Sequence, residues 1–165
     1  LREDWFNFIL TSSLIELVLV VNVSGSSARE EFDLLKYTLG LLKNGSYSNQ
    51  EKIFIARIFL WKMLAMSGWK PELTQCAISH KPLGSSVYYQ SPNGFVASEH
   101  NRNGFLIEDE LRSFLSRVIE EEDWDMLINT AGENGLRKKW LTLTQQYYQD
   151  IISKPLQSLK LFQYV

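Results

Sequence analysis

Apolar positions recur at helical spacing along most of this 165-residue chain, and polar or glycine residues divide them into segments. The first segment predicts a helix over residues 2–21, with two acidic residues in its first turn and a long apolar run after them. Glu16 interrupts that run near its middle, where a charge inside a bilayer would be costly. We therefore interpret this segment as a buried helix of a bundle and not as a membrane span.

Two further helices are predicted before residue 70. The first begins at the capping box Ser27-Ala-Arg-Glu30 and stops at Asn44-Gly45. The second begins at the capping box Ser48-Asn-Gln-Glu51, runs from about residue 49 to 67, and ends at Gly68. Its apolar residues lie on almost all sides, which predicts that this central helix sits in the middle of the domain.

The pattern changes to short strands after residue 86. Strands are predicted over residues 87–90 and 95–97, joined by the turn Ser91-Pro92-Asn93-Gly94, and a loop over 101–104 follows. Helical periodicity returns between Leu111 and Ile128, and a last helix over about 136–153 is closed by Pro155. The fold class predicted is mainly α: a helical bundle in a single domain over residues 1–165, with a small β-hairpin insertion at about 76–100.

Composition narrows the class of protein. Hydrophobic residues make up 45% of the chain and charged residues 22%, as in folded globular proteins. The net charge of −2 argues against a stand-alone nucleic-acid-binding protein, which usually has a basic surplus. A single cysteine excludes an internal disulfide and favours a reducing cytosol. Because the chain begins at Leu1, without Met or a signal peptide, we expect a fragment of a longer protein.

The insertion has the layout of a zinc knuckle with half of its ligands missing. A structural zinc site needs four donors, usually supplied by two Cys-x-x-Cys pairs. The first pair of positions here holds Cys76 and Ser79, and the second holds Ala97 and His100. Two of these four side chains cannot bind zinc, so this degenerate zinc-knuckle-like hairpin predicts no metal, and we expect no other cofactor.

No catalytic constellation is readable in the sequence. Cys76 as a nucleophile would need an activating base and an orienting group, and nothing assigns them, so a buried inert thiol is the preferred interpretation. The acidic run from Glu120 to Asp125 is interpreted as a solvated helix end and not as a catalytic carboxylate pair. We therefore expect that the protein is not an enzyme.

Several short pieces of the sequence follow one another in the order in which a known protein family carries similar pieces. Their sequences are Leu64-Ala-Met-Ser-Gly68, then Pro71, Leu73 and Cys76, then Gly94-Phe95-Val96-Ala97, then Lys154-Pro155-Leu156-Gln157-Ser158 and Leu161-Phe162. Together they resemble the C-terminal region of the RecO family of bacterial recombination mediators, many of whose members carry a four-cysteine site in the hairpin. The resemblance implies a helical domain that follows an N-terminal OB-fold, and no OB-like run of five strands lies upstream in this chain.

The resemblance also implies a function. RecO proteins anneal single strands and, together with RecR, help RecA to replace single-stranded DNA-binding protein (SSB) on gapped DNA. This implies a non-enzymatic role in DNA repair and recombination, in the bacterial cytosol and in association with the nucleoid. DNA contacts would be made mainly through the absent OB-fold. A helical protein-interaction adaptor of unrelated purpose is the alternative.

In the family, the helical domain docks the acidic, Phe-terminated tail of SSB, which requires an apolar slot and one or two cations. Arg57 precedes Trp61 by one helical turn and lies on the same face, next to a position where some members carry an arginine in this role. The predicted dock comprises Lys52, Arg57, Phe59, Trp61, Lys62 and Leu64. On spacing alone, an Arg57 that merely solvates an apolar helix is an equal alternative.

Weak nucleic-acid contacts are predicted at the local basic clusters, namely Arg102, Arg137, Lys138 and Lys139. The last three begin a helix, where cations oppose the helix dipole, and a solvent-exposed helix start explains them as well. The basic Lys-Ser-Arg of the family is replaced here by Gln157-Ser158-Leu159, which weakens DNA contact from that segment.

Overall fold

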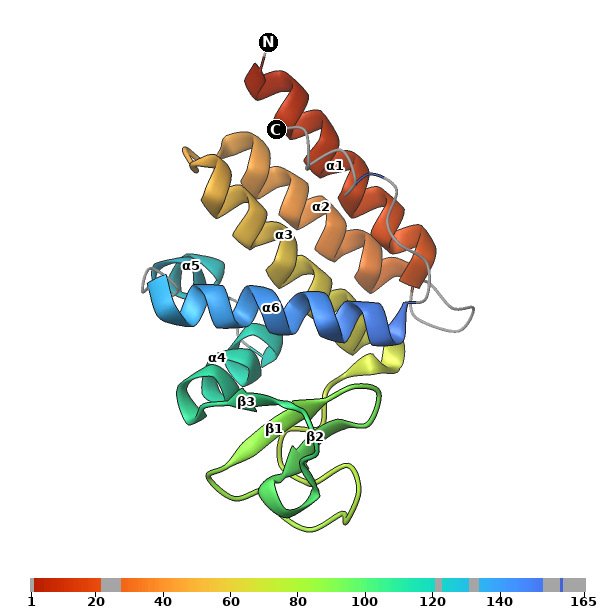
Figure 1. Cartoon of the computed structure of the whole chain (residues 1–165). Helices are drawn as coiled ribbons and strands as arrows, with labels where there is room; N and C mark the ends of the chain where they lie inside the picture. Colours follow the sequence, from red (N-terminus) through yellow and green to blue (C-terminus); the bar gives the residue numbers. More distant parts are fainter. Residues whose placement is uncertain (1, 22–27, 121–122, 131–133, 153–157, 159–165) are drawn as a thin grey trace. The chain divides into compact units, whose positions relative to one another are not determined.

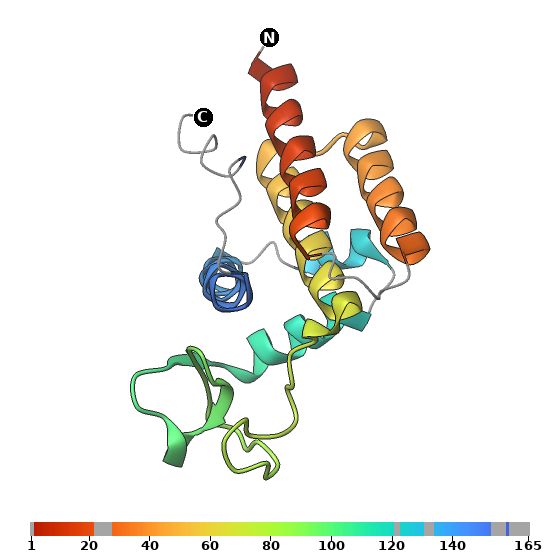
Figure 2. The same cartoon turned by 90° about the vertical axis from the view of Figure 1, so that its right-hand side faces the viewer.

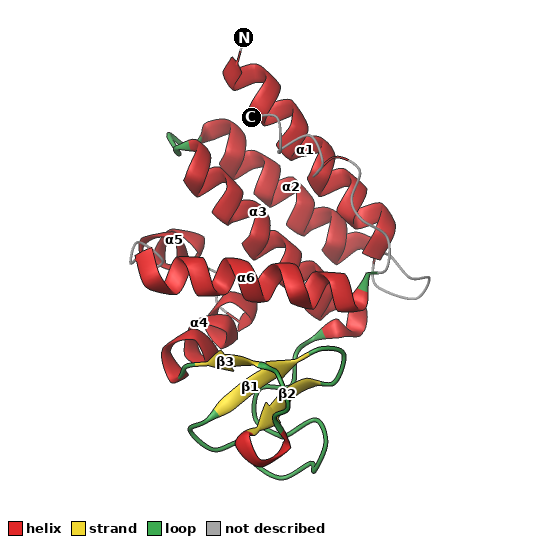
Figure 3. Cartoon of the chain, in the orientation of Figure 1, coloured by secondary structure: helices red, strands yellow, loops and turns green. Residues whose placement is uncertain are grey.

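The computed structural model describes residues 2–21, 28–120, 123–130, 134–152 and 158 (Figure 1). It is mainly helical with one small antiparallel sheet, which confirms the predicted fold class (Figure 3). The chain divides into two compact units: one comprises Leu1–Trp69 and Ile152–Val165, and the other comprises Lys70–Ile151. The expected single domain stays a prediction. Among the described residues, no helix is long and apolar enough to cross a membrane.

The first unit contains three helices that run side by side: α1 (Arg2–Val21), α2 (Ala28–Asn44) and α3 (Asn49–Leu64) (Figures 1 and 2). The bounds of α1 agree with the prediction, whereas the capping box expected at Ser27 lies outside the described residues. One face of α1 is buried through Phe6, Ile9, Leu10, Leu14, Leu17 and Val21. Its other face exposes Trp5, Phe8, Ile15 and Leu19.

The central helix α3 begins as its sequence predicts. Ser48 Oγ accepts a hydrogen bond from the Glu51 N–H at 3.3 Å, and the Ser48 N–H donates to Glu51 Oε2 at 2.7 Å. This reciprocal capping box satisfies backbone donors that the first helical turn leaves without partners. At its end, α3 passes into one wider π-type turn, Ala65–Trp69, in which Gly68 adopts a φ of 88° that glycine tolerates best.

The second unit contains the sheet, in the order β2-β1-β3, formed by β1 (Val87–Gln90), β2 (Gly94–Ala97) and β3 (Phe105–Ile107). The hairpin of β1 and β2 was predicted, and its register pairs Val87 with Ala97. The third strand was not predicted. Its three residues are too few to show alternation, and it is defined by pairing with β1, where Val87 faces Ile107.

Three helices complete this unit: α4 (Asp109–Glu120), α5 (Trp124–Thr130) and α6 (Asn134–Ile151). Phe114 of α4 meets Trp140 of α6 edge to face, with ring centroids 5.6 Å apart. The C-terminal part of α6 packs on the sheet, because Tyr147 lies 5.8 Å from Tyr89 and 6.5 Å from Phe95 between ring centroids. The predicted end of α6 at 153 and its closing Pro155 lie outside the described residues.

Candidate functional site

The apolar residues of the predicted dock on α3 belong to the core. Phe59 and Trp61 are 0% exposed and Leu64 is 1% exposed. Side chains that are buried on this scale cannot touch a ligand in the present arrangement. Of the predicted dock, only Arg57 and Lys62 are partly accessible, and the docking role stays a prediction.

The three cationic residues of α3 have different surroundings. Lys52 is only 5% exposed, and its Nζ donates to Asn7 Oδ1 of α1 at 3.1 Å. This ammonium group therefore helps to join α3 to α1. Arg57 is partly buried, with its Nη1 atom fully covered, and Lys62 is also partly buried. Arg57 and Lys62 consequently remain the cations of the predicted dock that are nearest to solvent.

The knuckle segment forms a tight turn between Gln75 and Pro82, which face each other across an isolated antiparallel bridge. The Cys76 N–H donates to the Lys81 carbonyl at 2.8 Å, and the His80 N–H donates to the Cys76 carbonyl at 2.8 Å. His80 closes the turn with a φ of 56°, in the left-handed region. Backbone hydrogen bonds between residues 75 and 82 therefore hold this segment in the shape of a knuckle.

Cys76 lies at the centre of a small apolar cluster. Its side chain is 0% exposed and packs with Val96 and Ala97, against which Leu83 and Tyr88 also pack. The Ala97 N–H donates to Cys76 Sγ at 3.4 Å. Cys76 and Ala97, the first and third of the four knuckle positions, are thus brought together, as the knuckle spacing predicts. However, the alanine has no donor atom for a metal.

The pKa of Cys76 reflects this setting. Burial raises the pKa of the thiol, whereas the Ser79 hydroxyl and the backbone of Ser79, Ala97 and Ile78 lower it, and the resulting value is about 6. Ser79 Oγ is itself buried without a hydrogen-bond partner among the described residues, so we attribute the lowering mainly to the backbone N–H groups.

The described residues contain no group of three or more His, Cys, Asp and Glu side chains arranged to hold a metal ion. Of the four knuckle positions, Cys76 is buried, Ser79 and His100 are partly buried, and Ala97 offers no donor atom. A four-ligand zinc site of the usual kind therefore has no complete ligand set here. That the chain binds no zinc stays a prediction.

The predicted nucleic-acid residues lie in two places within the second unit. Arg102 is exposed beside the end of β1, where its backbone N–H donates to Gln90 Oε1 at 2.9 Å. Arg137, Lys138 and Lys139 lie in the first turns of α6, and Lys139 forms an ion pair with Glu108. Arg102 thus lies near the last turns of α6, at Gln149 and Asp150, whereas the other three residues lie at the start of that helix. Their contact with nucleic acid stays a prediction.

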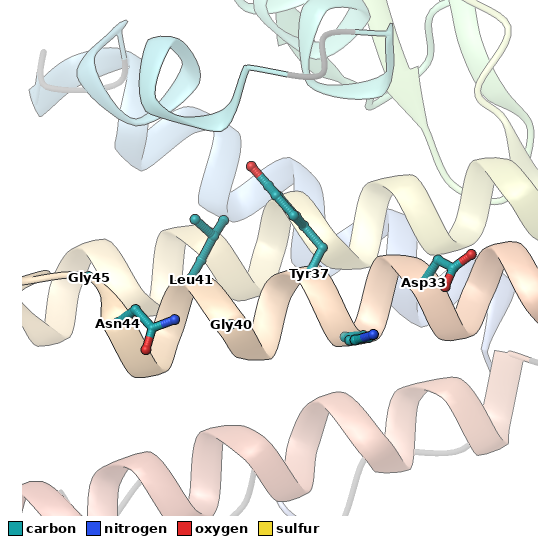
Figure 4. A pocket seen from close by; sticks show the side chains of 7 residues that line it. Asp33, Tyr37, Gly40, Leu41, Asn44 and Gly45 are labelled. Carbon is teal, nitrogen blue, oxygen red and sulfur yellow. The ribbon is translucent and has the colours of Figure 1, made fainter.

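A hollow of about 560 Å³ lies along α2, bounded among others by Asp33, Tyr37, Gly40, Leu41 and Asn44 (Figure 4). All of its lining residues come from α2 and the residue that follows it. Figure 4 shows the side chains of Tyr37 and Leu41 projecting from the same side of the helix. Because no second element supplies a convergent polar group, this hollow has no recognisable ligand chemistry.

A second hollow, of about 550 Å³, was missed from the sequence. It is formed by the end of β1, the loop before β3 and the last turns of α6. These segments supply Gln90, Ser91, Arg102, Asn103, Gln149 and Asp150. Within this lining, Asp150 accepts hydrogen bonds from the hydroxyl groups of Tyr89 and Ser91, each at 2.6 Å. No local sequence signal could identify it, because its segments lie far apart along the chain.

The sequence is also similar to known proteins. A family model described as Recombination protein O C terminal matches residues 2–160. Proteins named DNA repair protein RecO are similar to the chain: one from Alkaliphilus metalliredigens is 33% identical over 145 residues, covering 84% of this chain and 58% of that protein. One from Dehalococcoides mccartyi is 42% identical over 73 residues, covering 44% of this chain and 27% of that protein.

A further relative of the same name, from Bifidobacterium adolescentis, is 21% identical over 130 residues, covering 76% of this chain and 52% of that protein. The chain therefore spans about half, or less, of the length of the curated relatives it matches.

Proposed function

Because the chain belongs to the family of recombination protein O C-terminal domains, we propose that it is the helical part of a DNA repair protein that mediates recombination without catalysing a reaction. The observation that carries this proposal is the family match over residues 2–160. It is supported by similarity to proteins named DNA repair protein RecO from three bacterial genera.

We further propose that this part of the protein docks the acidic tail of SSB. Such a tail presents carboxylates and a terminal phenylalanine ring, so its site needs a cation beside an apolar surface. Arg57 is the cation that we assign. Ile53 and Leu60, which are partly buried, lie on the same side of α3 at positions four residues before Arg57 and three after it. These two side chains take the place of the buried residues Phe59, Trp61 and Leu64 as the apolar part of the dock.

Lys62 is the second choice for the cation. Successive residues of an α-helix are about 100° apart, so Lys62 lies about 140° round α3 from Arg57. The two cations cannot grip the same carboxylate from one face. Substitution of each residue separately therefore distinguishes two different positions of the peptide on this helix.

The remaining activities are proposed for the whole protein. Its relatives are about one and a half times as long as this chain, and a preceding OB-fold would supply most of the contacts with single strands. Annealing of strands, association with RecR and loading of RecA are assigned to that complete protein, with the helical part recruiting it to SSB-coated DNA.

The test uses the complete protein that contains this chain. Complementary single strands coated with SSB are mixed, and annealing is followed with and without the protein. Annealing should be accelerated, and the acceleration should be lost when SSB lacks its last residues. Equal rates with and without the protein would contradict the mediator role. Equal acceleration with truncated SSB would contradict the tail dock alone.

A helical protein-interaction adaptor is the second candidate. It is favoured by the exposed face of α1, where Trp5 and Phe8 are 53% and 59% exposed and their rings stack with centroids 5.7 Å apart. Exposed apolar groups of this size commonly mark protein contacts. An adaptor unrelated to DNA repair would leave the annealing reaction unchanged.

A further inference from the structure

The polar hollow beside β1 is lined by a carboxylate that two hydroxyl groups hold in place. Asp150 Oδ2 accepts from the Tyr89 hydroxyl and Asp150 Oδ1 accepts from the Ser91 hydroxyl, each at 2.6 Å. A carboxylate oxygen can accept more than one hydrogen bond, so both oxygens retain acceptor capacity. Because two donors hold its orientation, this carboxylate is prepared to accept from an N–H group of a ligand without a large loss of side-chain entropy.

Other polar side chains line the same hollow. Gln90 Oε1 accepts the backbone N–H of Arg102 at 2.9 Å, which orients the Gln90 amide and leaves its NH2 group for a ligand. Within the part of the chain that the structure describes, the side chains of Arg102, Asn103 and Gln149 make no hydrogen bond or ion pair. The hollow thus combines one guanidinium, four side-chain amides (Gln90, Asn103, Gln146 and Gln149) and one carboxylate in about 550 Å³.

We propose that this hollow takes one unstacked base of single-stranded DNA, with a neighbouring phosphate on Arg102. Amide and carboxylate side chains read the hydrogen-bonding edges of bases, and splayed bases are the usual targets of such groups in single strands. Phe105, which also lines the hollow, supplies an aromatic ring beside the base. This inference rests on the proposed role in DNA repair, and it adds a base-binding site that the basic clusters do not provide.

The chemistry also sets a preference among bases. Adenine, cytosine and guanine carry an exocyclic amino group that can donate to Asp150, whereas thymine offers only its single ring N3–H. Asp150 disfavours an acidic peptide tail in the same hollow, because like charges would be brought together. With a single cation, the site releases few counterions, so binding should depend only weakly on salt. This is how a chain with a net charge of −2 can contact a single strand.

The experiment titrates the 165-residue chain into fluorescent oligonucleotides of equal length and follows their anisotropy. The oligonucleotides are oligo-dC, oligo-dT and an abasic strand that keeps the phosphates. Oligo-dC should bind about three- to tenfold more tightly than oligo-dT, as expected for one hydrogen bond, and the abasic strand should bind most weakly.

Variants locate the site. Gln149→Ala and Arg102→Ala should each weaken oligo-dC binding about three- to tenfold. Gln145→Ala, an exposed glutamine of α6 outside the hollow, and Lys81→Ala, an exposed cation of the knuckle turn, are the matched controls and should bind like the wild type.

Three results would overturn the inference: no binding of any strand, equal affinity for the abasic strand, or unchanged affinity of both hollow variants. Displacement of oligo-dC from the wild-type hollow by an acidic peptide would assign it to a protein partner and would also overturn it. None of these results alters the annealing test with the complete protein, so the failure of the base site and the failure of the proposed function are distinguishable.

Discussion

Glu16 of α1 accepts two hydrogen bonds from Ser158, which lies 142 residues further along the chain. The Ser158 backbone N–H donates to Glu16 Oε2 at 2.9 Å, and the Ser158 hydroxyl donates to the same oxygen. This pairing gives a partner to the carboxylate that interrupts the apolar run of α1. It also gives a structural role to Ser158, one of the residues that carry the family resemblance, because this serine is tied to the first helix.

The loss of the Ser158 hydroxyl should therefore weaken the fold. Ser158→Ala should lower the free energy of unfolding by about 1.5–3 kcal/mol, because a hydrogen bond to a charged group is lost at a buried position. Urea denaturation measures this change. Ser85→Ala, at an exposed serine, is the control and should shift stability by less than about 0.5 kcal/mol. Equal effects at both sites would show that the Glu16 contact contributes little.

Truncation of the core of α3 should be among the most damaging changes. Phe59→Ala and Leu64→Ala should each cost about 2–5 kcal/mol, because both side chains are essentially inaccessible and leave cavities. Leu19→Ala removes a side chain that is 75% exposed on α1 and serves as the control. Losses below about half a kcal/mol at both core sites would mean that the inward face of α3 is assigned wrongly.

The knuckle should be stable without metal. Elemental analysis after dialysis should find no stoichiometric zinc, and a chelator should leave the thermal midpoint unchanged, because the ligand set is incomplete. Cys76→Ala should nevertheless lower the free energy of unfolding by about 1–3 kcal/mol, since this side chain is buried in the cluster with Val96 and Ala97. One zinc ion per chain that survives dialysis would contradict this account.

Tyr89 should make stability decrease at alkaline pH. Burial, together with the hydrogen bond to Asp150 and the charge of that carboxylate, raises the pKa of Tyr89 above its usual value. The folded state therefore keeps the phenol protonated, and this contribution is complete below the unfolded pKa of about 10 and is lost as pH rises above it. Chemical denaturation from pH 8 to 11 should show a smaller loss of unfolding free energy for Tyr89→Phe than for the wild type.

Tyr37→Phe, at a half-exposed tyrosine, is the control and should follow the wild type. Parallel curves of unfolding free energy against pH for all three proteins would refute the assignment to Tyr89.

Local signals predicted much of the fold. The bounds of α1, the first strand and the capping box at Ser48 follow from apolar spacing, from β-rich residues before a Pro-Asn-Gly turn, and from a four-residue motif. Each of these depends on neighbours in sequence. The strand β3 depends on pairing with β1, and no local pattern predicts it.

The candidate site was less predictable for the same reason. Periodicity showed that α3 is apolar on almost all sides, but it did not show which side stays accessible, so Phe59, Trp61 and Leu64 were placed in a dock wall although they are buried. Lys52 was predicted as a supporting cation of the dock, whereas its side chain is buried and donates to Asn7 of α1. In contrast, the contact of Cys76 with Ala97 could be predicted, because the spacing of the knuckle positions along the sequence implies it.

Binding of the SSB tail tests the central claim most directly. A peptide that ends in Asp-Phe is titrated calorimetrically into the chain, with a peptide ending in Asp-Ala as the ligand control. Arg57→Glu and Lys62→Glu are compared with Lys36→Glu, which makes the same type of charge change at an exposed lysine of α2. Because Nη1 of Arg57 is buried, Arg57→Gln is included, and circular dichroism confirms that each variant is folded.

We predict that the wild-type chain binds the Asp-Phe peptide in preference to the Asp-Ala peptide. Arg57→Glu should weaken binding by about 1–3 kcal/mol, the worth of a charge-assisted hydrogen bond, and Lys36→Glu should have no effect. A loss at Lys62→Glu but not at Arg57→Glu would move the peptide to the other side of α3. Absence of binding by the folded wild-type chain would contradict the claim that this part of the protein recruits a recombination mediator to SSB.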